Sequence, residues 1–403
     1  MTRNARIGLV ALAVICAAAG PALGAVGAAT EAPKEAQPGR WNTYHGGPSL
    51  DGVAEGSLPD TLTPRWRFMA GAPVRTTPVA GGGRIYFANV KGRLFAVDLR
   101  GAEVWSKTIP REKAVSRFSP DEQFDAPLAC FGDTLLAGSA DGVLYALDAA
   151  TGEIRWRADL DGTLLGSPNV DAGTRPARVF AIEQSMGVLH CLDFDTGEPV
   201  WRAQGVDRCD GSAGLGGGVL VLGSCMAALH VFSADTGELL REVPIDPDSQ
   251  VAAGVAVLGD AAFSGSRSGK VLQIDTKSGE IKWINADCTD EVFSTPAVDA
   301  AHVVFGSEAG DVYAVARADG RLLWTFSARG PATSAVLAGD KAVVAADGVL
   351  YVLGLADGKP LWSYEVCDDV TAPAVIDGMV IVGCDDGSVA AFGAPAGKGG
   401  PEP

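Results

Sequence analysis

The chain has 403 residues, of which 47% are hydrophobic and 20% charged, and its formal net charge is −17. This length can build a large core, and the acidity argues against a nucleic-acid partner, because phosphate binding needs a basic face. Glycine is abundant, with 52 residues, while aromatic residues make up only 7%. Such a composition favours many short strands joined by tight turns.

Residues 1–28 have the features of a secretory signal. Arg3 and Arg6 provide a positive start, an apolar run follows over 7–19, and small residues suited to cleavage come next. The run is too short for a membrane span, so no transmembrane segment is expected. Ile15 is bulky where lipoprotein signals carry a small residue before the cysteine, here Cys16, so lipid anchoring is not expected. The chain is predicted to be exported to the periplasm or the extracellular space.

Residues 29–62 are predicted to form a linker and a lead-in segment. Residues 30–39 are rich in Pro, Ala and Glu, a composition typical of disorder. The lead-in begins at Trp41 and contains the turn-forming residues Gly46, Gly47 and Pro48. A repeat domain is predicted over 63–393, followed by a flexible tail over 394–403.

The repeat domain is marked by tryptophans about 40 residues apart, a period typical of propeller repeats. One interval is doubled, and Arg241 occupies the missing position in the sequence from Thr236 to Arg241. The blade tryptophans are Trp66, Trp105, Trp156, Trp201, Trp283, Trp324 and Trp362.

A strand and turn signature recurs in phase with the tryptophans. Its clearest copy runs from Asp141 through the alternating strand 143–147 to Asp148, then through Thr151 and Gly152 to Trp156. In the turn, the Asp or Thr side chain accepts from backbone N–H groups and Gly supplies a positive φ. Further copies bring the total to eight and begin at Gly92, Gly187, Ala227, Gly269, Gly310, Gly348 and Gly387.

A second landmark, a small residue followed by Pro or another small residue, opens an apolar strand eight times. Each copy is expected to begin the strand that lines a central channel. The copies begin at Thr77, Ala126, Ser167, Ser212, Gly254, Thr295, Ser334 and Ala372.

These repeats predict one all-β, eight-bladed propeller of four-stranded antiparallel blades. A single blade cannot bury both faces, so blades must stack around a ring. Each Trp should lie on the outermost strand, cover the next blade's hairpin and donate its indole N–H to a carbonyl. The eighth copy lacks a Trp strand, whereas the strand around Trp66 has no repeat before it. That N-terminal strand should therefore complete the last blade and leave no free sheet edge there.

The repeats resemble the pyrroloquinoline-quinone (PQQ)-like β-propeller family over about residues 64–393, on the motif from Asp141 to Trp156 and its copies. The stretch from Trp41 to Asp51 is also similar to the lead-in of secreted bacterial members. The family contains quinoprotein dehydrogenases, which hold PQQ and calcium over the channel, and non-enzymatic propellers of the BamB type. The resemblance thus implies the fold and leaves two functional branches open.

The sequence favours the non-enzymatic branch. The dehydrogenases carry two adjacent cysteines that stack on the cofactor, and this chain has no such pair. No motif matches their calcium ligands or catalytic Asp. The repeat aspartates Asp98, Asp148, Asp193 and Asp275 are interpreted as turn residues, and four scattered histidines do not predict a metal site. We expect no catalysis and no cofactor, with a PQQ–calcium quinoprotein as the alternative.

Two disulfides are predicted from the blade topology, Cys209–Cys225 and Cys367–Cys384. In each pair one cysteine precedes the inner strand and the other follows the next strand, and two antiparallel strands bring those ends to the same face. Export permits the bonds to form. Cys288 occupies the same entry position as Cys209, so Cys209–Cys288 is a competing pair. Cys130 and Cys191 fall within strands and are expected to be buried thiols.

The expected function is that of an exported scaffold that binds a protein or peptide, in the BamB-like version during envelope assembly. A carbohydrate- or polymer-binding module is a further alternative, and the chain is expected to be a monomer. The binding place should be the channel mouth, beside the starts of the inner strands. Its candidate residues are Arg75, Arg117, Asp125, Arg208, Asp210, Asp290, Glu291, Arg329, Asp368 and Asp369.

Overall fold

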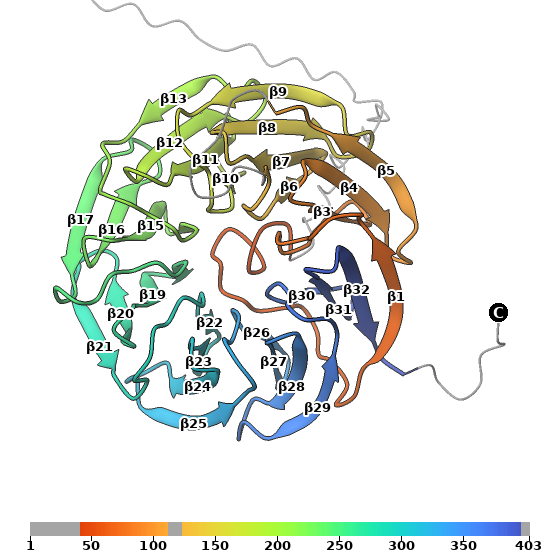
Figure 1. Cartoon of the computed structure of the whole chain (residues 1–403). Helices are drawn as coiled ribbons and strands as arrows, with labels where there is room; N and C mark the ends of the chain where they lie inside the picture. The colour runs from red at the N-terminus through yellow and green to blue at the C-terminus, as the bar shows by residue number, and fades with distance from the viewer. Residues whose placement is uncertain (1–40, 112–122, 396–403) are drawn as a thin grey trace, which may run out of the picture. The chain divides into compact units, whose positions relative to one another are not determined.

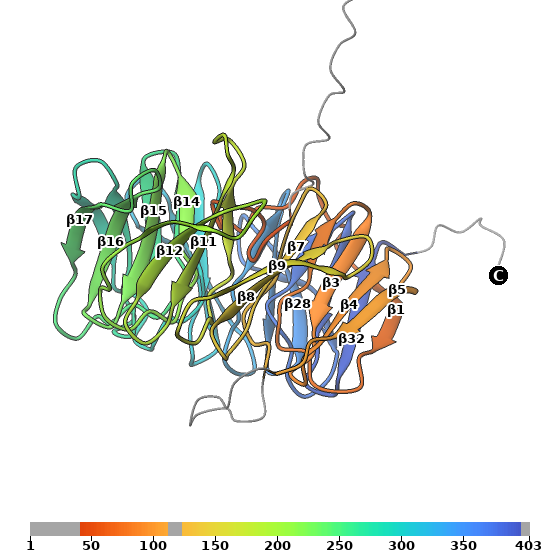
Figure 2. The same cartoon turned by 90° about the horizontal axis from the view of Figure 1, so that it is seen from above.

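The computed structural model describes residues 41–111 and 123–395, and these residues form eight four-stranded antiparallel sheets arranged as the blades of one propeller (Figure 1). Figure 2, at right angles to that view, shows the strands of neighbouring blades standing side by side. The prediction of an eight-bladed all-β fold is confirmed. Within the described residues, no helical stretch has the length and apolar character needed to span a bilayer.

Seven blades are built from consecutive strands that run from the channel outwards. The first three comprise β2 (Val79–Gly81), β3 (Arg84–Ala88), β4 (Arg93–Asp98) and β5 (Glu103–Thr108); β6 (Ala129–Phe131), β7 (Thr134–Gly138), β8 (Val143–Asp148) and β9 (Ile154–Asp159); and β10 (Asn169–Asp171), β11 (Arg178–Glu183), β12 (Val188–Asp193) and β13 (Pro199–Arg202). The next two comprise β14 (Gly214–Gly216), β15 (Val219–Ser224), β16 (Ala228–Ser233) and β17 (Leu239–Pro244); and β18 (Ala256–Leu258), β19 (Ala261–Gly265), β20 (Val271–Asp275) and β21 (Ile281–Asn285). The last two of the seven comprise β22 (Ala297–Val298), β23 (His302–Gly306), β24 (Asp311–Ala316) and β25 (Leu322–Ser327); and β26 (Val336–Ala338), β27 (Lys341–Ala346), β28 (Val349–Gly354) and β29 (Pro360–Glu365).

The eighth blade joins the two ends of the repeat domain. Its inner strands are β30 (Ala374–Ile376), β31 (Met379–Gly383) and β32 (Ser388–Gly393), and its outermost strand is β1 (Thr63–Met69). β1 pairs antiparallel with β32, in a register that places Thr63 opposite Gly393. The predicted closure by an N-terminal strand is confirmed.

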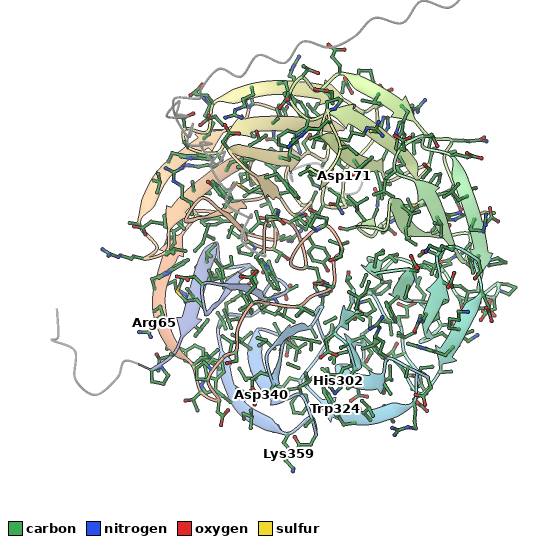
Figure 3. All side chains as sticks on the ribbon, turned by 180° about the vertical axis from the view of Figure 1, so that it is seen from behind. Arg65, Asp171, His302, Trp324, Asp340 and Lys359 are labelled. Carbon is green, nitrogen blue, oxygen red and sulfur yellow. The ribbon has the colours of Figure 1, made fainter. Side chains whose placement is uncertain are left out.

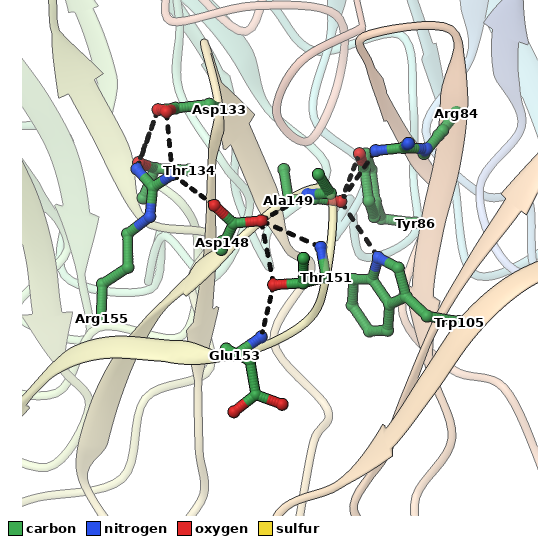
Figure 4. Close-up of polar contacts among 11 residues, drawn as sticks. Arg84, Tyr86, Trp105, Asp133, Thr134, Asp148, Ala149, Thr151, Glu153 and Arg155 are labelled. Carbon is green, nitrogen blue, oxygen red and sulfur yellow. Dashed lines mark hydrogen bonds and ion pairs between the residues drawn. The ribbon is translucent and has the colours of Figure 1, made fainter.

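The hairpin after Asp148 shows how each repeat is held (Figure 4). The Asp148 carboxylate accepts from the backbone N–H of Thr151 at 2.9 Å and from its hydroxyl at 3.0 Å. Hydrogen bonds from Arg155 and then Thr151 hold the pKa of Asp148 at about 2, so it is an ionised turn acceptor. Gly152 has φ +73°, and a Cβ there would lie 2.8 Å from the ring of Trp105. This turn position therefore requires glycine.

Five blade tryptophans donate their indole N–H to a carbonyl of the next blade, as predicted, whereas the indole N–H of Trp201 has no partner within the described residues. The indole N–H groups of Trp156 and Trp324 donate to the carbonyls of Phe194 at 2.9 Å and Leu355 at 2.7 Å in the following blade. Trp324 is labelled in Figure 3, where side chains fill the space between successive blades. Arg241 takes the place of the missing Trp: its aliphatic stem lies against Gly279, and its Nε donates to the Lys277 carbonyl at 3.1 Å.

Some predictions fall on residues that the structure does not describe. The signal segment over 1–28, the linker up to residue 40, Arg117 and most of the tail over 394–403 lie outside the described residues. The lead-in from Trp41 onwards is described, and it belongs to the same compact unit as the blades.

Candidate functional site

The lead-in follows the inside of the channel and bonds to the innermost strands. Each innermost strand is the edge of its sheet, so its N–H groups that face the channel need hydrogen-bond partners. The N–H groups of Ala80 and Cys130 donate to the carbonyls of Trp41 and Asn42, at 2.7 Å and 2.6 Å. In Figure 1 this red-orange segment winds around the middle of the ring.

The same pattern continues around the ring, always from the second residue of the innermost strand. The contacts are Leu215 to Pro48 at 2.8 Å, Val257 to Ser49 at 2.8 Å, Val298 to Asp51 at 2.7 Å and Leu337 to Gly52 at 2.8 Å. In the blade of β10, the side chain of Asn169 replaces the backbone and donates to the Pro48 carbonyl at 2.7 Å. Seven of the eight blades are thus hydrogen-bonded to one stretch over 41–54.

His45 fastens the lead-in at its centre. Its ring is buried, with Nδ1 2.7 Å from the Leu50 carbonyl oxygen and Nε2 2.8 Å from the Ala335 carbonyl oxygen. Burial is the largest effect on this ring and lowers its pKa. A neutral imidazole carries one N–H, so only one of the two carbonyl oxygens accepts a hydrogen bond from the ring.

Above the lead-in the channel opens into a funnel of about 380 Å³ that is bordered by loops of all eight blades. Its floor is Tyr44, whose buried hydroxyl lies 2.8 Å from Ser334 Oγ and 3.1 Å from Thr295 Oγ1. The walls are small, hydroxyl-bearing or apolar side chains, among them Thr77, Leu165, Ser212, Phe293, Ser294 and Thr333.

The charged groups at the funnel are mostly acidic. Among the described residues, Asp210, Glu308 and Asp369 line it together with one cation, Arg75. Burial, followed by the neighbouring carboxylates of Glu291 and Asp290, raises the pKa of Glu308. The funnel therefore presents a negative field that suits a cationic group better than an anion.

The structure brings three of the predicted mouth residues, Arg75, Asp210 and Asp369, to the funnel wall. Asp210 accepts from Gln184 Nε2 at 2.6 Å and from Arg208 Nε at 2.9 Å, which fixes its position.

The other described candidates do not line the funnel. Glu291 pairs with Arg267 at 3.0 Å, and Arg329 with Glu365 at 3.4 Å. Asp125, Asp290 and Asp368 are also outside its wall.

Sequence reasoning did not predict Tyr44 or Glu308 as funnel residues. Tyr44 lies in a lead-in that the sequence had singled out, but its path has no repeat to indicate it. Glu308 stands in a turn between β23 and β24, beside acids of the preceding loop, and only the ring arrangement brings these loops together.

The seven described cysteines are free thiols in the structure. Cys130 and Cys191 are buried within strands, as predicted. The sulfurs of Cys367 and Cys384 and a carboxylate oxygen of Asp386 lie within 4.8 Å of one another. Both predicted disulfides stay predictions.

A comparison with protein families distinguishes between the BamB-type propellers and the quinoprotein dehydrogenases. The family model described as outer membrane protein assembly factor BamB matches residues 101–209, 226–366 and 308–398, which is more than half of the chain. The chain belongs to this family. BamB of Xanthomonas campestris pv. campestris is similar, at 25% identity over 334 residues, 79% of this chain and 81% of that protein.

Solved structures show the shared fold. The crystal structure of BamB from Moraxella catarrhalis aligns with a TM-score of 0.69 at 21% identity, over 83% of this chain and 98% of that one. Quinohemoprotein alcohol dehydrogenase from Comamonas testosteroni aligns with a TM-score of 0.72 at 14% identity, over 90% and 82%. Membership of the BamB family therefore rests on sequence, because the propeller architecture is common to both branches.

Proposed function

We propose that this chain is an exported, non-catalytic propeller scaffold that binds a protein or peptide partner at the funnel, in the assembly of outer-membrane or envelope proteins. The observation that carries the proposal is the funnel itself. Loops of all eight blades border it, and Tyr44 closes its inner end. Its relatives in the BamB family are described as assembly factors.

The acidic lining supports a partner segment that carries a basic side chain. Asp210 and Asp369 stand on opposite parts of the ring, so a Lys or Arg entering the funnel would meet carboxylates from several blades. The walls provide hydroxyl groups for backbone hydrogen bonds and apolar surface at Leu165 and Phe293. This mixture suits an extended peptide.

The funnel does not fit PQQ, the cofactor of the alternative function. PQQ carries three carboxylates, whereas the described lining offers one cation, Arg75, beside the carboxylates of Asp210, Glu308 and Asp369. The carboxylates of the cofactor and those of the funnel wall would repel one another in this partly desolvated site. We therefore derive no chemistry through this cofactor.

Site-specific photocrosslinking tests the proposal. A photoreactive amino acid replaces Leu165 at the funnel, and in a matched control it replaces Lys359, which points away from the ring in Figure 3. In cells, the funnel position is expected to crosslink to a discrete protein partner and the control is not. Equal labelling from both positions, or none from either, would contradict the proposal. Calorimetric titration with PQQ and calcium tests the alternative, and no heat of binding is expected.

A further inference from the structure

A second cavity lies towards the end of the channel opposite the funnel. The funnel is bordered by residues that precede the innermost strands, such as Thr77 and Ser334, whereas this cavity is bordered by Phe131 and Asp171, the last residues of β6 and β10. The lead-in forms its other wall. We call it the far pocket; it has a volume of about 370 Å³, and its lining includes Asn42, Ser49, Phe131, Val170, Asp171 and Leu215.

Asn42 offers the far pocket a side-chain amide that the rest of the protein does not use. The residue is 4% exposed, and its backbone carbonyl accepts from the N–H of Cys130 at 2.6 Å. Its side chain forms no hydrogen bond with any other described residue. A Cβ on Gly47, which also borders the pocket, would have Asn42 Oδ1 as its nearest contact, at 3.9 Å, so the amide oxygen lies beside open space. Buried amides are normally satisfied, so the partner of this one must be a molecule in the pocket, either water or a ligand.

Asp171 borders the same space with an acceptor that is fixed in position. It is the last residue of β10, and its Oδ1 accepts from the backbone N–H of Gly173 at 2.9 Å in the turn that follows. A carboxylate can accept several hydrogen bonds, so Asp171 can also accept from hydroxyl groups of a ligand. Ser49 adds a hydroxyl from the lead-in. The far pocket thus combines an amide that donates and accepts with a hydroxyl and a carboxylate.

The remaining lining and its charge restrict the ligand further. Phe131, Val170 and Leu215 contribute apolar side-chain surface. The carboxylates of Asp51 and Asp171 border the pocket, and none of its described lining residues is a lysine or arginine, so an anion would be repelled.

A cation alone would not complete the site either. An ammonium group could pair with the carboxylate of Asp171, but it has no lone pair to accept from the amide nitrogen of Asn42. The far pocket therefore suits a neutral molecule whose polar groups both donate and accept, beside an apolar face. Its volume lies within the range of small-molecule sites.

We infer that the far pocket binds one neutral pyranose unit of a sugar. A sugar hydroxyl donates and accepts at once, so two neighbouring hydroxyls match the side-chain amide of Asn42, and a third can donate to Asp171. The C–H face of the ring covers the apolar surface of Phe131, Val170 and Leu215. This site is separate from the funnel and does not depend on the function proposed for it.

Ligand-observed saturation-transfer NMR with the full chain tests the ligand class. The probes are the methyl α-D-pyranosides of glucose, galactose and mannose, which differ only in the orientation of their hydroxyls. At least one should bind saturably, with a Kd of about 1 mM or below. The methyl glycoside of the corresponding uronic acid, which adds a carboxylate, should bind at least about tenfold more weakly. No saturable binding of any of the probes, or tighter binding of lysine amide, would overturn the inference.

Asn42→Leu separates sugar binding from folding. Leucine is similar in size and replaces an amide that has no partner among the described residues, so the midpoint of urea unfolding should stay the same or rise. Sugar affinity should fall at least about tenfold, because the hydrogen bonds to the amide are lost. An unchanged sugar affinity in this variant would contradict the proposed site.

Asp171→Asn tests the carboxylate against a matched control. The substitution keeps the shape of the side chain and should weaken sugar binding roughly fivefold, because an amide offers one acceptor oxygen in place of two. The control is Asp299→Asn. Asp299 occupies the equivalent position after β22, accepts from the backbone N–H of Ala301 at 2.7 Å and lies outside the lining of the far pocket, so its substitution should leave sugar affinity unchanged. An equal loss of affinity in both variants, or no loss in Asp171→Asn, would refute the assignment.

Discussion

Replacing Trp324 and Trp201 by phenylalanine should have different effects on stability, although both residues hold the same repeat position. The indole N–H of Trp324 donates to the Leu355 carbonyl at 2.7 Å, in a buried setting. The indole N–H of Trp201 has no partner in the described part of the chain. Phenylalanine keeps a ring over the next hairpin in both cases, so the hydrogen bond is the main difference.

The size of the difference follows from that bond. Trp324→Phe leaves a buried carbonyl without its donor, which costs about 1 to 3 kcal/mol. Trp201→Phe removes a buried unsatisfied donor, so it avoids this cost and retains only the loss of indole volume. We expect Trp324→Phe to destabilise the propeller by about 2 kcal/mol more than Trp201→Phe.

Equilibrium urea unfolding measures the difference, with both variants and the parent chain at the same pH and protein concentration. The slope against urea should be equal in all three, so that midpoints report stability. Trp283→Phe is a replicate, because its indole also donates to a carbonyl, that of Arg317 at 2.9 Å. If Trp201→Phe costs as much as Trp324→Phe or Trp283→Phe, the hydrogen-bond argument is refuted.

Three further predictions concern the repeat, the histidines and the thiols. Arg241→Trp restores the repeat residue over Gly279 and should raise stability by about 1 kcal/mol in urea unfolding; a lower midpoint would contradict this. Burial lowers the pKa of His190 to about 4, so its contribution to stability is complete above pH 6.5 and is lost as the pH falls towards 4. His190→Tyr introduces the residue found at this position in three other blades and should reduce the loss of unfolding free energy at low pH by about 2 kcal/mol. If the unfolding free energy of the variant depends on pH as that of the parent chain does, His190 is not the group responsible. Cys367–Cys384 should appear as a disulfide in non-reducing peptide mapping of exported protein, and its reduction should cost about 3 kcal/mol; two free thiols there would exclude it, and the buried Cys130 is the unreactive control.

The repeat made most of the fold predictable. The period of the repeat predicted the position of each blade, the outermost strand that carries Trp324, and the substitution of Arg241 for the expected Trp. These predictions succeeded because each repeat contacts the same neighbours in the same geometry. The closing strand followed from counting, since Trp66 had a strand without a repeat and the last repeat had no Trp strand. Local turn chemistry was equally transferable, as Asp148 and Gly152 show.

The binding surfaces were less predictable, because they depend on departures from the repeat. Tyr44 belongs to a lead-in that has no periodicity, in which Trp41 before it and Leu50 after it both have positive φ. The funnel residues Asp210 and Asp369 could be predicted only as members of a wider set of loop charges.

The position of the N-terminal segment has a consequence for the order in which the protein can form. Residues 41–69 leave the ribosome before any blade exists, yet the lead-in bonds to strands as late as β26 and β1 bonds to β32. The hydroxyl of Thr63 reaches the Gly393 carbonyl across 330 residues of chain. The first part of the chain must therefore wait for the last, and the ring can close only after the whole repeat domain has been synthesised.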